Sequence, residues 1–158
     1  MINTLLLLAF VLPVPLFGRR GGEQTDATAM KELRQVFAAM NISVTGDHPR
    51  CREPNLYSLY VRGSRQVVVC PRGDQSDTLR HEGWHAVQSL CLSGRPWLSR
   101  ETIEQRLTGT ARSELQAFVT ANRWQREAEA RVIASLKVNA YRVELEKACG
   151  LTDAQPSS

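Results

Sequence analysis

The chain has 158 residues, of which 42% are hydrophobic and 23% are charged, and its formal net charge is +4. This composition is typical of one small globular domain with a single core. Arginine and lysine are scattered among acidic residues and no stripe of basic and aromatic residues appears, so we expect no nucleic-acid partner.

Residues 1 to 18 are uncharged and almost wholly apolar, and Pro13 and Pro15 interrupt them. A membrane-spanning helix needs about 20 apolar residues, so this segment is better interpreted as a secretory signal peptide. No basic residue precedes the apolar run and Arg19-Arg20 follow it, which leaves an N-terminal membrane anchor as the alternative. Both interpretations predict an exported protein (periplasmic, lumenal or secreted), attached to a membrane in the second case.

A short N-terminal part is expected to lead into the domain. The polar residues 19 to 25 predict a flexible tether, and Asp26 is a candidate cap for a helix that runs to about Met40. Residues 42 to 45 alternate as a short strand does. His48 follows in a turn and is interpreted as a surface residue, with a role as metal ligand left open.

A β-hairpin is predicted next, because residues 56–62 and 65–70 are rich in Tyr, Val and Leu and Gly63-Ser64 separate them. A short helix is expected from Arg100 to about Leu107. Residues 111 to 148 contain no Gly or Pro, which predicts one long helix, or two with a bend near residues 122–126. Gly150 is placed to end the last helix. We therefore expect a single domain over residues 26–151 and a disordered tail over 152–158.

The four cysteines are an even number, which suits disulfides in an exported protein. Cys51 and Cys70 flank the predicted hairpin, whereas Cys91 and Cys149 each end a predicted helix. Of the three possible pairings we favour 51–70 with 91–149. The alternative is a set of free, buried thiols in a reducing compartment.

The chemistry of the chain is concentrated in His81-Glu82-Gly83-Trp84-His85, which has the pattern H-E-x-x-H. In a helix, residues four apart lie within about 40° of each other around the axis, so His81 and His85 can bind one metal ion. Glu82 lies beside them, placed to take a proton from a metal-bound water.

The rest of the stretch favours a helix with an apolar back and a polar front. Gly83 on the back would allow another element to approach closely, and Trp84 is expected to pack at the rim. Candidate N-caps precede the motif, and apolar residues gather on the face away from His81. The caps are Asp74, Ser76 and Asp77, and the apolar face consists of Leu79, Gly83, Ala86, Val87 and Leu90.

This motif helix resembles the active-site helix of the zincin metallopeptidases, a resemblance that covers about one helix of the chain. It implies an α+β fold: a mostly helical, minimal zincin-like domain with the β-hairpin packed beside the active-site helix. It also implies a Zn²⁺ cofactor, a peptide or protein substrate, and hydrolysis by a metal-activated water with Glu82 as general base. In zincins an edge strand binds extended substrate, so the hairpin would be a substrate platform; otherwise it only covers the helix.

A catalytic zinc site needs a third protein ligand. The metzincin extension of the motif fails here, because Gln88 and Cys91 occupy its glycine and third histidine positions. The gluzincin branch, which takes a glutamate from a downstream helix, is therefore favoured. We favour Glu114, which borders an apolar stripe, over Glu104. The candidates are Glu101, Glu104, Glu114, Glu127 and Glu129.

Two alternatives to a peptidase remain: a non-catalytic zinc-binding module, and a disulfide-stapled helical envelope protein without metal, either one acting as an interaction module. Tyr57 and Tyr60 on the hairpin, or Tyr141 and Arg142 on the last helix, could donate a hydrogen bond to an oxyanion, and nothing in the sequence singles one out. We expect the chain to be a monomer.

Overall fold

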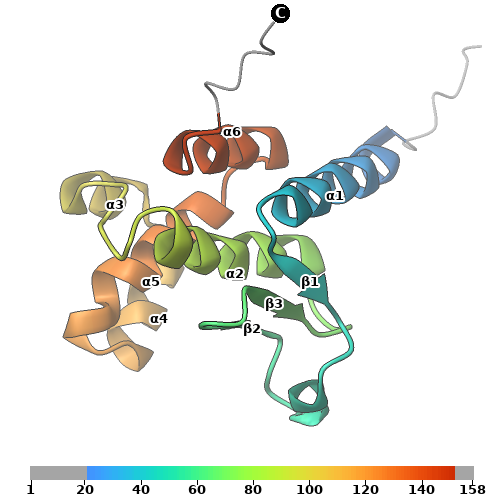
Figure 1. Cartoon of the computed structure of the whole chain (residues 1–158). Helices are drawn as coiled ribbons and strands as arrows, with labels where there is room; N and C mark the ends of the chain where they lie inside the picture. The colour runs from blue at the N-terminus through green and yellow to red at the C-terminus, as the bar shows by residue number, and fades with distance from the viewer. Residues whose placement is uncertain (1–20, 152–158) are drawn as a thin grey trace, which may run out of the picture.

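A computed structural model of the chain describes residues 21 to 151, and Figure 1 shows the arrangement of its elements. The predicted α+β, mostly helical class is confirmed. Six helices make up most of this part of the chain: α1 (Gly21–Ala39), α2 (Gln75–Leu90), α3 (Arg100–Arg106), α4 (Gly109–Phe118), α5 (Ala121–Ala134) and α6 (Val138–Ala148). Three short strands and one 3-10 turn complete it: β1 (Ser43–Thr45), η1 (Pro49–Arg52), β2 (Ser58–Val61) and β3 (Gln66–Val69).

Helix α1 begins earlier than its sequence suggests. It starts at Gly21, so residues 21 to 25 are helical and are not part of a tether. Buried Leu33 and Phe37 hold the helix on the core, and extending a formed helix by further residues without proline costs little. The predicted leader (1–18), the start of the tether (19–20) and the tail (152–158) lie outside the described residues.

The helices of residues 21 to 151 include none with the length and hydropathy needed to cross a bilayer.

The sheet has the strand order β1-β3-β2. Strands β2 and β3 form the predicted hairpin, antiparallel with Leu59 opposite Val68, and Gly63 makes the turn at a φ of +82°. Strand β1 lies parallel to β3 on its other side, a pairing that the sequence did not predict. The central position of β3 explains why all three of its valines are buried, and it leaves β2 with one free edge beside α2.

Both predictions for residues 111–148, one long helix or two with a bend near residues 122–126, are wrong, because the structure has three helices there. The backbone is extended at Val119 and Thr120, and again at Lys137, so the chain turns between α4, α5 and α6. These turns let α4 and α5 fold against each other and bury Leu115 in a small second core. No Gly or Pro marks the ends of these helices within residues 111–148. The chain breaks there because the separate helices can bury more apolar surface against one another.

Helix α2 is the central element and packs against the sheet, α5 and α6 (Figure 1). Trp84 is fully buried, not at the rim as predicted, because α5 covers it and the Glu129 carboxylate accepts its indole N–H at 3.0 Å. Two disulfides have the favoured pairing: Cys51–Cys70 joins the two sides of the hairpin, and Cys91–Cys149 joins the ends of α2 and α6.

Candidate metal centre

The start and the buried face of α2 determine where its histidines lie. The Asp74 carboxylate caps the helix by accepting hydrogen bonds from the backbone N–H groups of Ser76 and Asp77, both at 3.0 Å. The apolar face predicted from the sequence is mostly buried, with Leu79 and Val87 fully inaccessible. With this face on the core, His81 and His85 lie on the side of α2 that meets α5.

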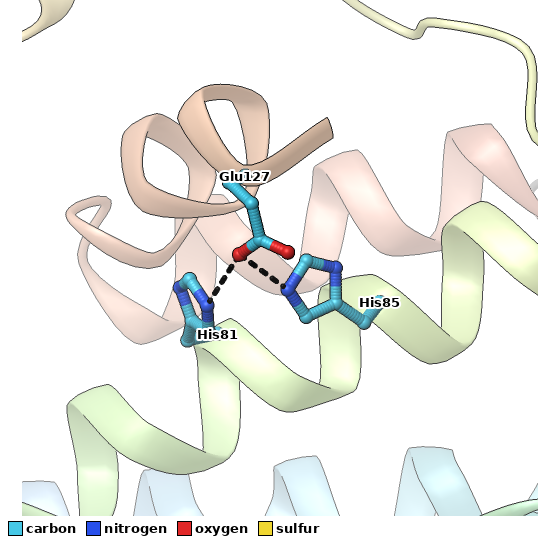
Figure 2. Close-up of side chains that lie close together, drawn as sticks. All are labelled: His81, His85 and Glu127. Carbon is cyan, nitrogen blue, oxygen red and sulfur yellow. Dashed lines mark hydrogen bonds and ion pairs between the residues drawn. The ribbon is translucent and has the colours of Figure 1, made fainter. Parts of the chain in front are cut away.

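The structure brings a third group, Glu127 of α5, to the two histidines. Its Oε2 atom lies 3.6 Å from Nε2 of His81 and 3.2 Å from Nε2 of His85, and Figure 2 shows the carboxylate between the two rings. The three candidate ligand atoms all lie within 4.8 Å of one another. Tetrahedral zinc ligands about 2.0–2.1 Å from the ion are about 3.3 Å apart. The two distances to Glu127 are close to this value, and a donor set of two nitrogens and one carboxylate suits zinc.

The charges of the three groups support one another. Burial disfavours the ionised form of Glu127, but hydrogen bonds and charges from His81 and His85 outweigh it, and the pKa of Glu127 lies well below its usual value. Burial lowers the pKa of His85, but the hydrogen bond and negative charge of Glu127 dominate and raise it. In the metal-free protein the ionised carboxylate of Glu127 thus already stabilises positive charge at this position.

A hydrogen-bond chain behind His85 fixes the orientation of its ring. Gln88 Nε2 donates to the carbonyl of Arg126 at 3.0 Å and to Glu129 Oε1 at 2.9 Å, so the other amide atom, Oε1, must face His85 Nδ1 at 2.8 Å. An amide oxygen only accepts, and Nδ1 therefore carries a proton. Arg126 Nε also lies 3.4 Å from Nδ1, and a hydrogen bond from this donor would require Nδ1 to carry no proton. This contact is longer and weaker than the 2.8 Å contact with Gln88, so the Gln88 contact decides the position of the proton. When the ring is neutral, Nε2 keeps its lone pair on the side of Glu127.

Glu129 anchors this chain. It is 1% exposed, and its carboxylate accepts hydrogen bonds from Trp84, Gln88 and the backbone N–H groups of Trp97 and Leu98. A buried carboxylate needs such partners. Glu129 therefore holds α2, α5 and the loop after α2 together and is not available as a metal ligand.

The centre opens into a cavity of about 660 Å³. Glu82 lines it together with His81, His85 and Glu127, and Ser58 of β2 donates a hydrogen bond to Glu82 Oε1 at 2.9 Å. The second oxygen of Glu82 has no hydrogen-bond partner among residues 21 to 151. The predicted general base thus lies beside the three-residue cluster without belonging to it.

The favoured third ligand, Glu114, does not lie in this cluster, which corrects the sequence analysis. It lies on α4, its side chain is 46% exposed, and its carboxylate pairs with Arg131 at 2.9 Å. The break at residues 119–120 turns α4 away and leaves α5 facing α2. Glu104 is also elsewhere, paired with Arg100 at 2.9 Å on the exposed side of α3.

Glu127 was among the five candidate ligands, but its position in the sequence did not favour it over Glu114. The sequence does hold a signal for it: Glu127 directly precedes the Ala-rich segment Ala128-Glu129-Ala130, and small residues are typical of a helix that packs closely on a neighbour. Ala128 and Ala130 are fully buried. Glu127 and Glu129 flank this packed face, and of the acidic residues on the helices after α2 they have the least access to water.

The other candidate residues are now placed. Tyr141 is fully buried and donates to the carbonyl of Arg80 at 2.9 Å, and Tyr57 is half exposed. Tyr60 lines the cavity, and its buried hydroxyl has no hydrogen-bond partner in the described part of the chain. His48 caps the short turn η1 through its ring nitrogen, as a structural turn residue does.

Comparisons with models of protein families, with curated proteins and with solved structures each found no match to this chain. Any functional conclusion therefore rests on the geometry of the site.

Proposed function

We propose that this protein is a small, exported, zinc-dependent metallopeptidase that binds Zn²⁺ through His81, His85 and Glu127 and uses Glu82 as general base. The observation that carries the proposal is the meeting of these four residues at one cavity, with one candidate ligand atom from each of His81, His85 and Glu127 all within 4.8 Å of one another. The zincin resemblance of the motif helix agrees with this, with Glu127 in the place of the gluzincin glutamate.

The opening of the site favours catalysis over a structural zinc. Structural zinc sites have four protein ligands and are closed, whereas catalytic sites have three and leave a position for water. Here three protein groups border a cavity large enough for a ligand, since ligand pockets measure about 300–1,000 Å³. A zinc ion bound there would polarise a substrate carbonyl and lower the pKa of water to about 7.

Glu82 would carry the proton. With Ser58 holding Oε1, the free oxygen Oε2 would accept a proton as water attacks the peptide carbonyl, and would return it to the departing amine. Tyr60 would supply the donor to the oxyanion, because this residue lines the same cavity and its buried hydroxyl has no hydrogen-bond partner within residues 21 to 151.

The free edge of β2 supports a peptide as substrate. Residues Ser58, Leu59 and Tyr60 of this strand line the cavity, and an edge strand offers unpaired backbone groups to an extended chain. Export is supported by the two disulfides, which persist in oxidising compartments.

The test is the Glu82→Gln variant. The purified protein and the variant are each loaded with zinc and incubated with a mixture of peptides, and the products are identified by mass spectrometry. Cleavage by the wild type, abolished by a chelator and by Glu82→Gln while the variant keeps its zinc, is the expected result. Glu104→Gln, an exposed glutamate on α3, is the matched control and should cleave normally.

A different result would contradict the peptidase. Bound zinc without cleavage of any peptide, together with a loss of thermal stability on chelation, would indicate a non-catalytic zinc-binding module. Equal cleavage by the wild type and by Glu82→Gln would remove Glu82 from the mechanism.

A further inference from the structure

A second cavity of about 360 Å³ adjoins the cavity of the metal centre, and arginines line both. Arg62, Arg123 and Arg126 line the two cavities, and Arg95 lines the second one. We call these four residues the arginine cleft. Because the two cavities share three residues, the arginine cleft continues directly from the position where His81 and His85 meet Glu127.

The acids of the same cavities are already engaged by other groups. Glu129 accepts four hydrogen bonds, Glu82 accepts one from Ser58, and Glu127 lies between the histidines. Four guanidinium groups thus outnumber three carboxylates, each of which has another role.

The arginines themselves are poorly paired. Within residues 21 to 151, Arg62 makes neither a hydrogen bond nor an ion pair, and Arg95 and Arg126 have no carboxylate partner. Arg123 contacts only Glu127, at 3.4 Å. Elsewhere in the described chain, arginines on the helices often have a carboxylate within reach, as Arg100, Arg131 and Arg142 do. The cleft therefore presents unused cationic donors.

We propose that the arginine cleft binds a carboxylate of the substrate, so that the metal centre acts on peptides with a negative charge beside the scissile bond. This inference rests on the proposed function, for which it names the substrate class. The carboxylate is either the free C-terminus of the peptide or an acidic side chain, since both present the same group.

The chemistry of arginine supports this choice. The guanidinium group is always charged and its planar fork of N–H donors matches a carboxylate in a two-point contact. Next to a bound divalent cation, such a cleft attracts anions and orients the peptide along the line from β2 to the loop after α2. The backbone of the peptide would then lie at the free edge of β2, and its carboxylate beyond the metal centre.

The test measures binding without turnover. Full-length, zinc-loaded Glu82→Gln protein is titrated into four fluorescent hexapeptides of one sequence, and anisotropy gives each Kd. The first peptide has a free C-terminus and one aspartate, the second a C-terminal amide, the third asparagine for aspartate, and the fourth both changes. We expect the fourth to bind about 10–100-fold more weakly than the first, the range for losing charged hydrogen bonds. The second and third show which carboxylate is recognised.

Arginine variants complete the test. Arg62→Gln and Arg95→Gln, each in the Glu82→Gln background, should weaken the first peptide at least several-fold and leave the fourth unchanged. Arg106→Gln is the matched control, because Arg106 is exposed on α3 and makes no side-chain contact with another described residue. Zinc content and circular dichroism are recorded for every variant.

Each outcome decides between the claims. Equal Kd values for the four peptides, no binding of any of them, or unchanged binding in Arg62→Gln and Arg95→Gln would overturn the arginine cleft. Weaker binding of the uncharged peptide that depends on Arg62 and Arg95 supports the arginine cleft, whether or not the protein holds zinc or cleaves peptides. The proposed peptidase is tested separately, by zinc content and by cleavage, so failure of the peptidase and failure of the arginine cleft are distinguishable.

Discussion

Gln88 is the residue that determines how His85 meets a metal. Its amide connects the His85 ring to Glu129, and its two donor contacts leave only one orientation of the amide. Neither the H-E-x-x-H pattern nor helical phase predicts this role, because the partners lie on α5, about 40 residues away in the chain.

We predict that Gln88→Ala lowers zinc affinity about 10–100-fold, the usual cost of removing a residue that orients a ligand. Without the amide, the His85 ring can place its proton on either nitrogen. Competition with a chromophoric chelator measures the affinity. Gln105→Ala, at an exposed glutamine of α3, is the control and should bind zinc as the wild type does. Unchanged affinity in Gln88→Ala would show that the ring is oriented by other contacts.

The pH dependence of zinc binding follows from His85. Zinc displaces the proton of the imidazole, so affinity falls with decreasing pH below the pKa of His85 in the metal-free protein. Glu127 raises this pKa above 6.5, so the loss of affinity should begin above pH 6.5. Zinc titrations between pH 5 and 8 check the direction.

The cause of this raised pKa can be tested separately. In metal-free Glu127→Gln, burial still disfavours the charged ring and only the smaller effects of Gln88 and Glu82 oppose it, so the pKa of His85 should fall relative to the wild type. NMR titration of the imidazole measures it. A pKa that stays high in Glu127→Gln would mean that another acid, such as Glu82, raises it.

Among the elements, α2 could be predicted almost completely and α5 could not. The Asp74 cap, the buried face and the histidine pair all follow from local spacing and residue type. The boundaries of α4, α5 and α6 depend on how the helices pack on one another, and no Gly or Pro marks them. The same packing brings Glu127 to the site, so the third ligand depends on tertiary structure.

The close packing at Gly83 gives a prediction for α2. A Cβ there would meet the ring of Phe37 from α1 and would lie 2.9 Å from the Tyr141 hydroxyl of α6. Gly83→Ala should therefore lower the free energy of unfolding by about 1–3 kcal/mol, although alanine is the better helix former. Urea denaturation measures this.

The control for Gly83→Ala is Gly109→Ala, at the start of α4, where a Cβ would have nothing within 4 Å. It should leave stability unchanged or raise it slightly. Equal effects of the two changes would contradict the tight approach of α1 and α6 to α2.

For the molecule as a whole, the two disulfides differ in how much chain they close. Cys51–Cys70 spans 19 residues and Cys91–Cys149 spans 58. Loop-closure entropy assigns about 3 kcal/mol to the first and about 4 kcal/mol to the second. Replacing both cysteines of the 91–149 pair with serine should therefore destabilise the protein more than replacing the 51–70 pair. Urea denaturation under oxidising conditions compares them, and the reverse order would contradict this ranking.

The Cys91–Cys149 disulfide also helps to hold the metal-centre helix α2 in place. It fixes the end of α2 to the end of α6, while the sheet and α5 hold the sides of α2. A helix secured in this way keeps His81 and His85 at a constant distance from α5. A small domain can thus present a preorganised site despite having few residues for a core.

The most direct test of the whole account is the zinc content of the full chain compared with that of His81→Ala, Glu127→Gln and Glu114→Gln. Elemental analysis after dialysis gives zinc per chain, and circular dichroism confirms that each variant is folded. We predict about one zinc in the wild type and in Glu114→Gln, and almost none in His81→Ala and Glu127→Gln. Zinc retained by Glu127→Gln, or no zinc in the wild type, would contradict the metal centre described here.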